Sequence, residues 1–123
     1  MKIYFAHPQT IDYQSTIYQP AKSSPLLSAH ECILPHDDTP ETHRNNTRDF
    51  YRTLDLIIAE VSAPATGLGI ELGWAADDGT PIYCFYQEGT KPSGSIYATT
   101  DHVTSYTDAA DFIRQVERIV RSK

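Results

Sequence analysis

Short apolar runs alternate with polar segments along this chain, and each run has the length of a strand. Runs of about four to eight residues that are apolar on both faces are typical of strands buried inside a parallel sheet. Five short segments are predicted strands, over 3–6, 32–34, 56–61, 82–86 and 103–106, and of these 56–61 and 82–86 are the ones expected to be buried on both faces. The run over 56–61, LIIAEV, is the strongest of them and predicts the central strand.

Helical segments are predicted between these strands. They lie within 13–29 (from Pro20 onward), and over 48–54, 70–77 and 108–120. Pro25 shortens, kinks or breaks the first helix, and Asn45 or Thr47 is placed to cap the second. Gly79 is placed to end the third. Polar loops are expected over 36–44, 64–69 and 91–100, the last with one helical turn.

Strands that alternate with helices at this spacing predict a three-layer α/β domain around a parallel sheet. Five strands in so short a chain favour a flavodoxin-like, Rossmann-like order, 2-1-3-4-5, in a single domain over 1–123. In such sheets a ligand lies beyond the carboxyl ends of the strands. The segments expected there are 7–12, 36–38, 62–71 and 87–95.

Composition narrows the class of partner. Of the 123 residues, 40% are hydrophobic, which is enough for one core, and the formal charge of -6 argues against a nucleic-acid binder. No apolar stretch is long enough to span a membrane and no signal-peptide pattern is present, so we expect a cytoplasmic protein without a membrane partner. Cys32 and Cys84 read as buried, reduced thiols. No zinc spacing occurs and the histidines are scattered, so neither a metal nor a cofactor is expected.

The chemistry is expected in the segment over 59–75, AEVSAPATGLGIELGWA, which leads from the central strand into a helix. Gly67 and Gly69 permit backbone conformations and close approaches that a Cβ would forbid. Glu71 then falls in the first helical turn, where free N–H groups and the helix dipole favour its ionised form. An ionised carboxylate facing the ligand crevice is suited to act as a nucleophile. A purely structural glutamate is the alternative, because Glu is common in first turns.

Tyr4 in the first strand, together with the segment over 55–75, DLIIAEVSAPATGLGIELGWA, resembles the nucleoside 2-deoxyribosyltransferase superfamily. The closest likeness is to its 2'-deoxynucleoside 5'-monophosphate N-glycosidase branch. The resemblance implies a flavodoxin-like fold and cleavage of an N-glycosidic bond. It also implies a homodimer or larger homo-oligomer whose sites are completed by a neighbouring subunit.

The resemblance also implies roles for particular residues. Glu71 matches the family's nucleophile, which attacks C1' of the sugar, displaces the base and forms a glycosyl-enzyme ester. Tyr4 matches the tyrosine that orients this glutamate. Ser93, in SGSI, resembles a serine that reaches a neighbouring subunit's phosphate pocket. Release of the sugar to water or to a second base stays open, so hydrolase and transferase are both retained.

Two departures from the family pattern concern the family's aspartate and the recognition of phosphate. The family's Asp falls at Thr47 here, and Asp49 is the nearest candidate to replace it, although two residues along a helix turn by about 200°. Ala65 stands where the phosphate branch has Ser. Thr66 and the backbone N–H groups from Gly67 to Gly69 remain as donors for an anion.

A third departure lies in the first loop, AHPQTID, which lacks the Gly-Ser-Ile-Arg character of the phosphate branch. His7 or Gln9 would then recognise the substrate. His36, after the second strand, is a candidate general acid for the leaving base. Trp74 reads as packing or a dimer contact rather than a platform for the base.

These residues predict an N-glycosidase or deoxyribosyltransferase that acts on a nucleoside or nucleoside monophosphate. The alternative is a nucleotide-binding or regulatory module that keeps the fold but has lost turnover, which Thr47 and Ala65 favour. A flavin carrier or phosphoacceptor receiver fits the fold, but Ser62 rather than Asp follows the central strand.

Overall fold

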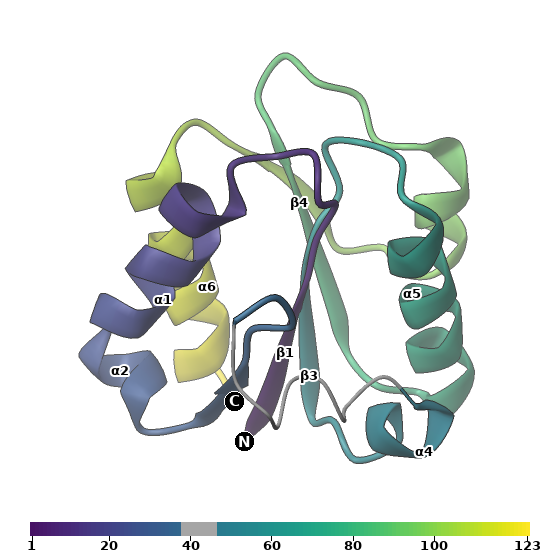
Figure 1. Cartoon of the computed structure of the whole chain (residues 1–123), viewed down its shortest axis with the longest axis horizontal. Coiled ribbons are helices and arrows are strands. Elements are labelled where there is room, and N and C mark those ends of the chain that lie inside the picture. Colours follow the sequence, from purple (N-terminus) through teal and green to yellow (C-terminus); the bar gives the residue numbers. More distant parts are fainter. Residues whose placement is uncertain (38–46) are drawn as a thin grey trace.

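The computed structural model describes residues 1–37 and 47–123. It contains a parallel sheet of five strands in the order β2-β1-β3-β4-β5 (Figure 1), which confirms the predicted order. The strands are β1 (Lys2–Ala6), β2 (Glu31–Ile33), β3 (Leu56–Glu60), β4 (Ile82–Gln87) and β5 (Val103–Tyr106). Asp38, Asn45 and most of the loop predicted over 36–44 lie outside the described residues.

Helices cover both faces of the sheet, which confirms the three layers (Figure 1). One face carries the π-helical turn η1 (Gln14–Tyr18), α1 (Gln19–Ser23), α2 (Pro25–Ser28) and α6 (Ala109–Arg121). The other carries α4 (Arg48–Tyr51), α5 (Thr66–Asp78) and the 3-10 turn η2 (Gly94–Ala98). None of the described helices is both long and apolar enough to cross a bilayer.

Alternation along the strands decides which side chains meet which helices. In β1, Ile3 and Phe5 pack in the core beneath α1 and α6, whereas Tyr4 packs in the core beneath α4 and α5. The neighbours of β1 hold this register, because Tyr4 pairs with Ile33 of β2 and Ile57 of β3. The phenol of Tyr4 is thereby directed to the side on which α5 carries Glu71.

The largest correction concerns α5, which begins at Thr66 and not at position 70. Ala65 is the last extended residue, and the two glycines read as a turn are helical. Their φ angles are not positive, unlike those of Gly79 and Gly89. A helix tolerates glycine at a cost of about 1 kcal/mol each, and here the packing of α5 against the sheet outweighs it. Gly79, with φ 75°, ends the helix as predicted.

The predicted first helix is also divided. Pro25 begins a new helix, α2, because Ser24 is extended and its hydroxyl caps that helix by accepting a hydrogen bond from Leu27 N. The second predicted helix is shorter than expected, since α4 ends at Tyr51. Thr47 caps it, and its Oγ1 accepts a hydrogen bond from Phe50 N at 3.2 Å. The helix over 108–120 is confirmed as α6, with Asp108 as its cap.

Candidate active site

The carboxylate of Glu71 is held by two tyrosines from different elements. Tyr4 Oη in β1 donates to Glu71 Oε1 at 3.2 Å, as the predicted pairing requires. Tyr51 Oη, at the end of α4, donates to the same oxygen at 3.0 Å. The two hydroxyl oxygens are 3.1 Å apart, so the three oxygen atoms form a triangle.

Burial acts on all three groups of this triangle. It raises the pKa of Glu71 above its usual value, while the hydroxyls of Tyr51 and then Tyr4 counteract the rise. Burial is also the main cause that raises the pKa of Tyr4 and of Tyr51, so both phenols keep their protons and remain donors. Two neutral donors therefore stabilise the charged form of a partly buried carboxylate.

The source of that stabilisation differs from the sequence prediction. Because α5 begins at Thr66, Glu71 falls in its second turn, and no acidic residue lies in the first. The free N–H groups and the helix dipole act mainly within the first turn, so they are not the donors to Glu71. Among the described residues no donor to Glu71 Oε2 is found, and this second oxygen is left available for reaction.

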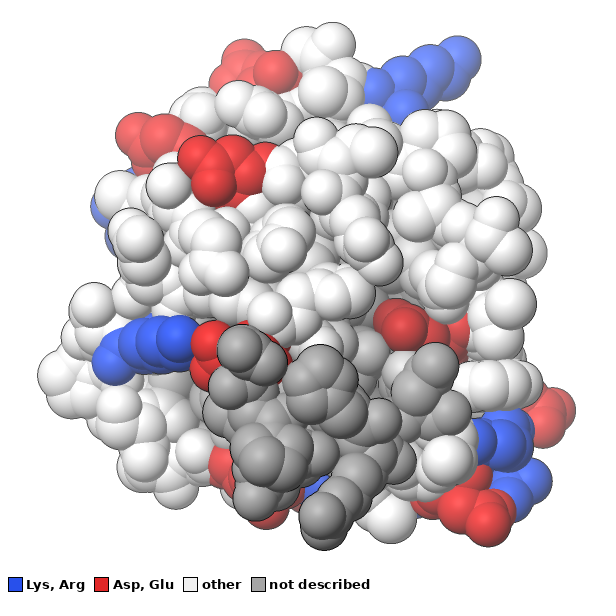
Figure 2. Space-filling model, in the orientation of Figure 1, with Lys and Arg blue, Asp and Glu red and all other residues white. Residues whose placement is uncertain are grey.

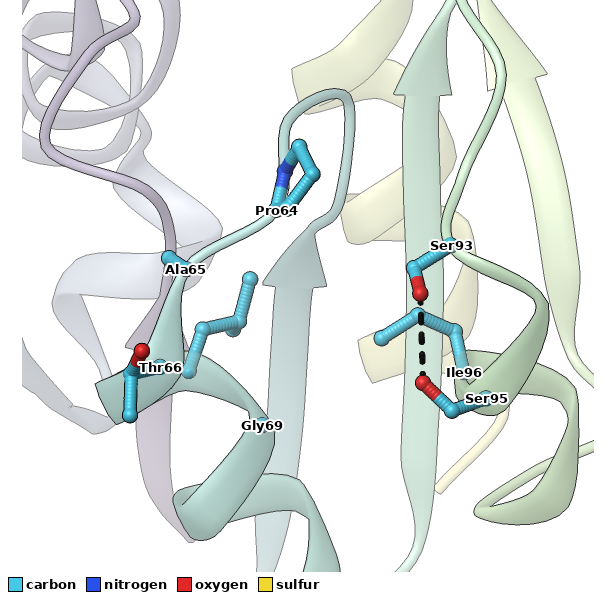
Figure 3. Close-up of a pocket in the computed structure, with 8 residues that line it drawn as sticks. Pro64, Ala65, Thr66, Gly69, Ser93, Ser95 and Ile96 are labelled. Carbon is cyan, nitrogen blue, oxygen red and sulfur yellow. Dashed lines mark hydrogen bonds between the residues drawn. The ribbon is translucent and has the colours of Figure 1, made fainter.

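A pocket of about 330 Å³ opens beside the start of α5 (Figure 3). One wall is the end of the β3–α5 loop with the first turn of α5, and the other is the start of η2. Its lining residues are Pro64, Ala65, Thr66, Leu68, Gly69, Ser93, Ser95 and Ile96. No side chain caps α5 at Ala65, so its first N–H groups remain without a side-chain acceptor. The volume is at the lower end of the range for small-molecule sites.

The structure thus brings four of the predicted substrate-binding residues to one pocket: Ala65, Thr66, Gly69 and Ser93. Gly67 is exposed in the same helical turn. The Ser93 and Ser95 hydroxyls are 3.2 Å apart. Ser93, expected to reach a neighbouring subunit, here lines the pocket of its own chain.

His7 occupies a different position from that of a substrate-recognising side chain. It is 7% exposed, and both of its ring nitrogens have partners. The carbonyl of Pro8 accepts at 2.8 Å, so Nδ1 carries the proton and Nε2 accepts from the Tyr18 hydroxyl at 2.8 Å. That hydroxyl in turn accepts from the backbone N–H of His36 at 2.8 Å. Burial lowers the pKa of His7 to about 4, so the ring is neutral.

The other two candidates near His7 are exposed. The ring of His36 lies 5.2 Å from that of His7 and 5.6 Å from that of Tyr13, measured between centroids. Gln9 follows in the first loop and is open to solvent. His36 and Gln9 therefore remain accessible at the carboxyl edge of the sheet, and their roles stay predictions.

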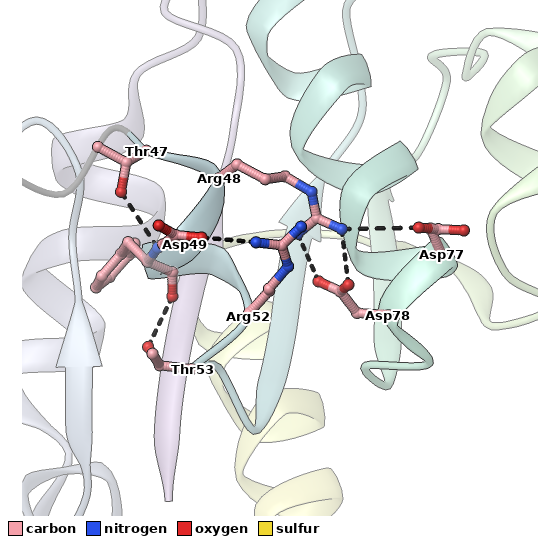
Figure 4. Close-up of polar contacts among 8 residues, drawn as sticks. Thr47, Arg48, Asp49, Arg52, Thr53, Asp77 and Asp78 are labelled. Carbon is pink, nitrogen blue, oxygen red and sulfur yellow. Dashed lines mark hydrogen bonds and ion pairs between the residues drawn. The ribbon is translucent and has the colours of Figure 1, made fainter.

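Asp49 and Thr47 are not brought to Glu71. The side chain of Asp49 is 91% exposed and pairs with Arg52, Oδ1 to Nη1, at 2.6 Å (Figure 4). Thr47 is exposed and its hydroxyl caps α4. The geometry therefore gives no support to Asp49 as a replacement for the family's aspartate. Two residues along a helix correspond to a rotation of about 200°, so Asp49 points in a different direction from the residue at position 47.

Sequence reasoning missed Tyr51 as a partner of Glu71. It lies within the helix predicted over 48–54 and is buried in the structure. A buried phenol needs a hydrogen-bond partner, and that requirement was the available signal. Trp74 packs against Tyr51 with ring centroids 5.3 Å apart, which agrees with the first of its two predicted roles, and a dimer contact stays a prediction.

A second carboxylate, Glu60, was also missed. Glu60 is the last residue of β3 and is 1% exposed. It lies on the face of the sheet opposite to that of Tyr4 and Glu71. Ser62 donates to it from N at 2.6 Å and from Oγ at 2.7 Å, and the Tyr106 hydroxyl donates to Oε2. Ser62 Oγ accepts from Gln87 N at 2.7 Å. Glu60 therefore joins the ends of β3, β4 and β5, which is a structural role.

Charge does not gather around the site as a basic patch. In the view of Figure 2 the central part of the face carries few charged side chains, and both signs mix at the corner over α4. That corner holds Arg48 and Arg52 with their acidic partners Asp49, Asp77 and Asp78. An anionic ligand at this face would depend on backbone N–H groups and hydroxyls. The described residues hold no cluster of three or more His, Cys, Asp or Glu side chains suited to a metal ion.

Comparisons with known proteins agree with the sequence resemblance. The chain is 30% identical over 92 residues to a Syntrophotalea carbinolica protein named "Putative 2'-deoxynucleoside 5'-phosphate N-hydrolase 1". The match covers 65% of this chain and 65% of the length of that relative. No family model matches. The resemblance to the nucleoside 2-deoxyribosyltransferase superfamily, and to its monophosphate N-glycosidase branch, is confirmed.

Two solved structures share the fold. The Clostridium botulinum CMP N-glycosidase BcmB superimposes with a TM-score of 0.64 at 17% identity, over 95% of this chain and 99% of that one. A conserved protein from Enterococcus faecalis V583 gives a TM-score of 0.60 at 14% identity, over 97% and 98% of the two chains. At these identities the likeness concerns the fold.

Proposed function

We propose that this protein cleaves the N-glycosidic bond of a nucleoside or nucleoside 5'-monophosphate, with Glu71 as the nucleophile. One observation carries the proposal: two phenols hold one oxygen of a partly buried carboxylate, and the described residues supply no donor to the other oxygen. Glu71 belongs to the helix whose first turn lines a pocket at the carboxyl edge of the parallel sheet, where ligands of such folds bind, although Glu71 is not itself one of the lining residues. The names of the relatives point to the same class of reaction.

The geometry suits a reaction in two displacements. Glu71 Oε2 attacks C1' of the sugar, and the base leaves with the electron pair of the broken bond and takes up a proton from water or from His36. Oε1 becomes the carbonyl oxygen of the resulting ester and keeps the hydrogen bonds from Tyr4 and Tyr51. Water or an acceptor base then attacks C1' and releases the carboxylate. Hydrolase and transferase share this first step.

The pocket beside the start of α5 suits the 5'-phosphate of a monophosphate. The uncapped N–H groups of the first turn and the hydroxyls of Thr66, Ser93 and Ser95 are neutral donors that surround it. Ala65 supplies no hydroxyl, so the phosphate would be held less strongly than in the branch that has Ser there. We infer a preference for the monophosphate that stays within about tenfold.

We also propose that the protein acts as a homodimer or larger homo-oligomer. Two large apolar side chains are exposed on the α5 and η2 side: Ile70, at 49%, and Tyr97, at 54%. Packing against a second copy would remove both from water and place another subunit beside the pocket.

A binding or regulatory module is the second candidate. It is favoured by the position of Asp49, which pairs with Arg52, and by Thr47, whose hydroxyl caps α4. Neither residue supplies a carboxylate at Glu71, where the family has an aspartate to assist the reaction. Such a module would bind a nucleotide in the same crevice without releasing its base.

Chromatography separates these functions. The protein is incubated with deoxynucleosides and their 5'-monophosphates, with and without an acceptor base, beside its Glu71→Ala variant as a control. Free base without an acceptor identifies a hydrolase, and exchange of the base identifies a transferase. Binding without either product identifies a module. Equal turnover by the wild type and Glu71→Ala would refute the assignment of the nucleophile.

A further inference from the structure

We propose that Tyr51 is a positioning residue for Glu71, and that Arg48 sets the position of Tyr51 by fastening α4 to the end of α5. The role in catalysis rests on the function proposed above. The placement of the carboxylate itself does not, and it can be measured in a protein without a known substrate.

Tyr51 makes the shorter of the two phenol contacts with Glu71. Its hydroxyl is 3.0 Å from Oε1, compared with 3.2 Å for Tyr4, and its ring is buried. The rings of the two tyrosines meet edge to face, with centroids 5.2 Å apart. Tyr4 belongs to the central part of the sheet, so its place is fixed by strand pairing. Tyr51 depends instead on where α4 lies.

A helix as short as α4 cannot fix its own position. It spans four residues, Arg48–Tyr51, and a single turn is unstable unless tertiary contacts hold it. At its far end Lys2 provides one such contact, because Lys2 Nζ donates to Thr53 Oγ1 at 2.9 Å and Asp55 Oδ2 accepts from Lys2 N at 2.7 Å. These bonds fasten the segment that follows α4 to β1. The beginning of α4 must be held by other residues.

Arg48 supplies that contact at the first position of α4. Its guanidinium donates two hydrogen bonds to Asp78 at the end of α5, both at 2.7 Å, and lies 3.7 Å from Asp77 (Figure 4). It also lies over the ring of Trp74, 5.6 Å from its centroid, and the same ring packs against Tyr51 at 5.3 Å. The fork geometry of arginine makes such a two-bond contact directional.

Arg52 provides a matched control four positions later. It carries the same charge and also forms an ion pair, Nη1 to Oδ1 of Asp49 at 2.6 Å. Both members of that pair are mostly exposed and belong to the same short segment, so the pair does not join α4 to α5. An effect of charge alone would appear in either arginine variant. An effect of fastening α4 would appear only in the Arg48 variant.

The direct experiment titrates Glu71 in protein labelled with 13C at glutamate side chains, with its signal assigned from Glu71→Gln. Tyr51→Phe removes one donor and keeps the ring, so the pKa of Glu71 should rise by roughly one unit. Arg48→Gln should move it in the same direction by less, Arg48→Lys should restore part of the difference, and Arg52→Gln should leave it unchanged. Circular dichroism confirms that each variant is folded.

Where the wild type cleaves a nucleotide, the acid limb of kcat/KM should shift upward in Tyr51→Phe and kcat should fall about tenfold. Absence of turnover in the wild type would refute the proposed function, and the titration would still test the placement of the carboxylate. If Tyr51→Phe does not fold, Arg48→Gln and Asp78→Asn still test the proposal. Each removes one partner of the contact between α4 and α5 and leaves the Tyr51 side chain in place. An unchanged Glu71 titration in folded Tyr51→Phe, or equal effects of Arg48→Gln and Arg52→Gln, would overturn the proposal.

Discussion

Acidification is expected to destabilise the fold through His7, whose ring is neutral, buried and bonded at both nitrogens. Its pKa falls from an ordinary 6.5 to about 4 in the folded protein. Between these values the unfolded chain binds a proton that the folded chain does not. Stability from this group is therefore fully present above pH 6.5 and is lost as the pH falls through 4.

The size of the effect follows from the difference between the two pKa values. At about 1.4 kcal/mol per unit, the loss in free energy of unfolding is on the order of 3 kcal/mol. That is a large part of the total for a domain of this size, since typical values are about 5–15 kcal/mol. Most of this loss should appear between pH 6 and 4.

Urea unfolding at pH 7, 5.5 and 4 measures this loss in the wild type, in His7→Gln and in His102→Gln. His7→Gln should be less stable at pH 7, because the contacts with Pro8 and Tyr18 are weakened. It should then lose roughly 3 kcal/mol less than the wild type on acidification. His102 is exposed, so His102→Gln should follow the wild type. Glu71, whose raised pKa acts in the opposite sense, is present in all three proteins and cancels in the comparison. Parallel losses in the wild type and His7→Gln would refute the reasoning.

Three further predictions concern the site and the assembly. Replacing Ser93 and Ser95 by Ala in a Glu71→Ala background should weaken the binding of a monophosphate, measured by calorimetry, by about tenfold and leave a nucleoside unaffected; equal weakening of both ligands would contradict the phosphate site. A chelator should not change the turnover rate, because phenols stabilise Glu71; a loss that one divalent ion restores would contradict this. Ile70→Lys should shift the sedimentation coefficient toward that of a monomer, and an unchanged value would exclude the surface around Ile70 as the interface.

The pattern of apolar runs was sufficient to predict the sheet, because the strands are short, β1, β3 and β4 are largely buried, and polar residues or Pro separate the strands from their neighbours in the chain. The start of α5 was not predictable in this way. Gly67 and Gly69 resemble a turn in sequence, and only packing of Leu68 and Leu72 against the sheet shows that they are helical. Local preference is weak and tertiary contacts override it.

The candidate site was predictable where one strand and one helix meet, and not where a third element contributes. Tyr4 and Glu71 were paired from the resemblance and lie within hydrogen-bond distance. Tyr51 reaches the same oxygen from α4, whose position depends on the pairing of Arg48 with Asp78, thirty residues away in the chain. A contact of this separation leaves no periodic signal. His7 was predicted to recognise the substrate because it follows the first strand at the carboxyl edge of the sheet, whereas in the structure Tyr13 and Tyr18 pack against its ring.

Glu60 has a consequence for how the crevice opens. Its carboxylate and the Ser62 hydroxyl connect the ends of β3, β4 and β5 by hydrogen bonds. The loop between β3 and α5 therefore begins at a fixed position. Fluctuations that would admit the proposed nucleotide substrate should then be confined to segments beyond these hydrogen bonds. In hydrogen exchange the amides of Ser62 and Gln87 should be protected as strongly as those of the central sheet, while the first turn of α5, with its uncapped N–H groups, exchanges quickly. Glu60→Gln, which keeps the shape of the side chain but removes its charge, should speed exchange at the amides of Ser62 and Gln87 together.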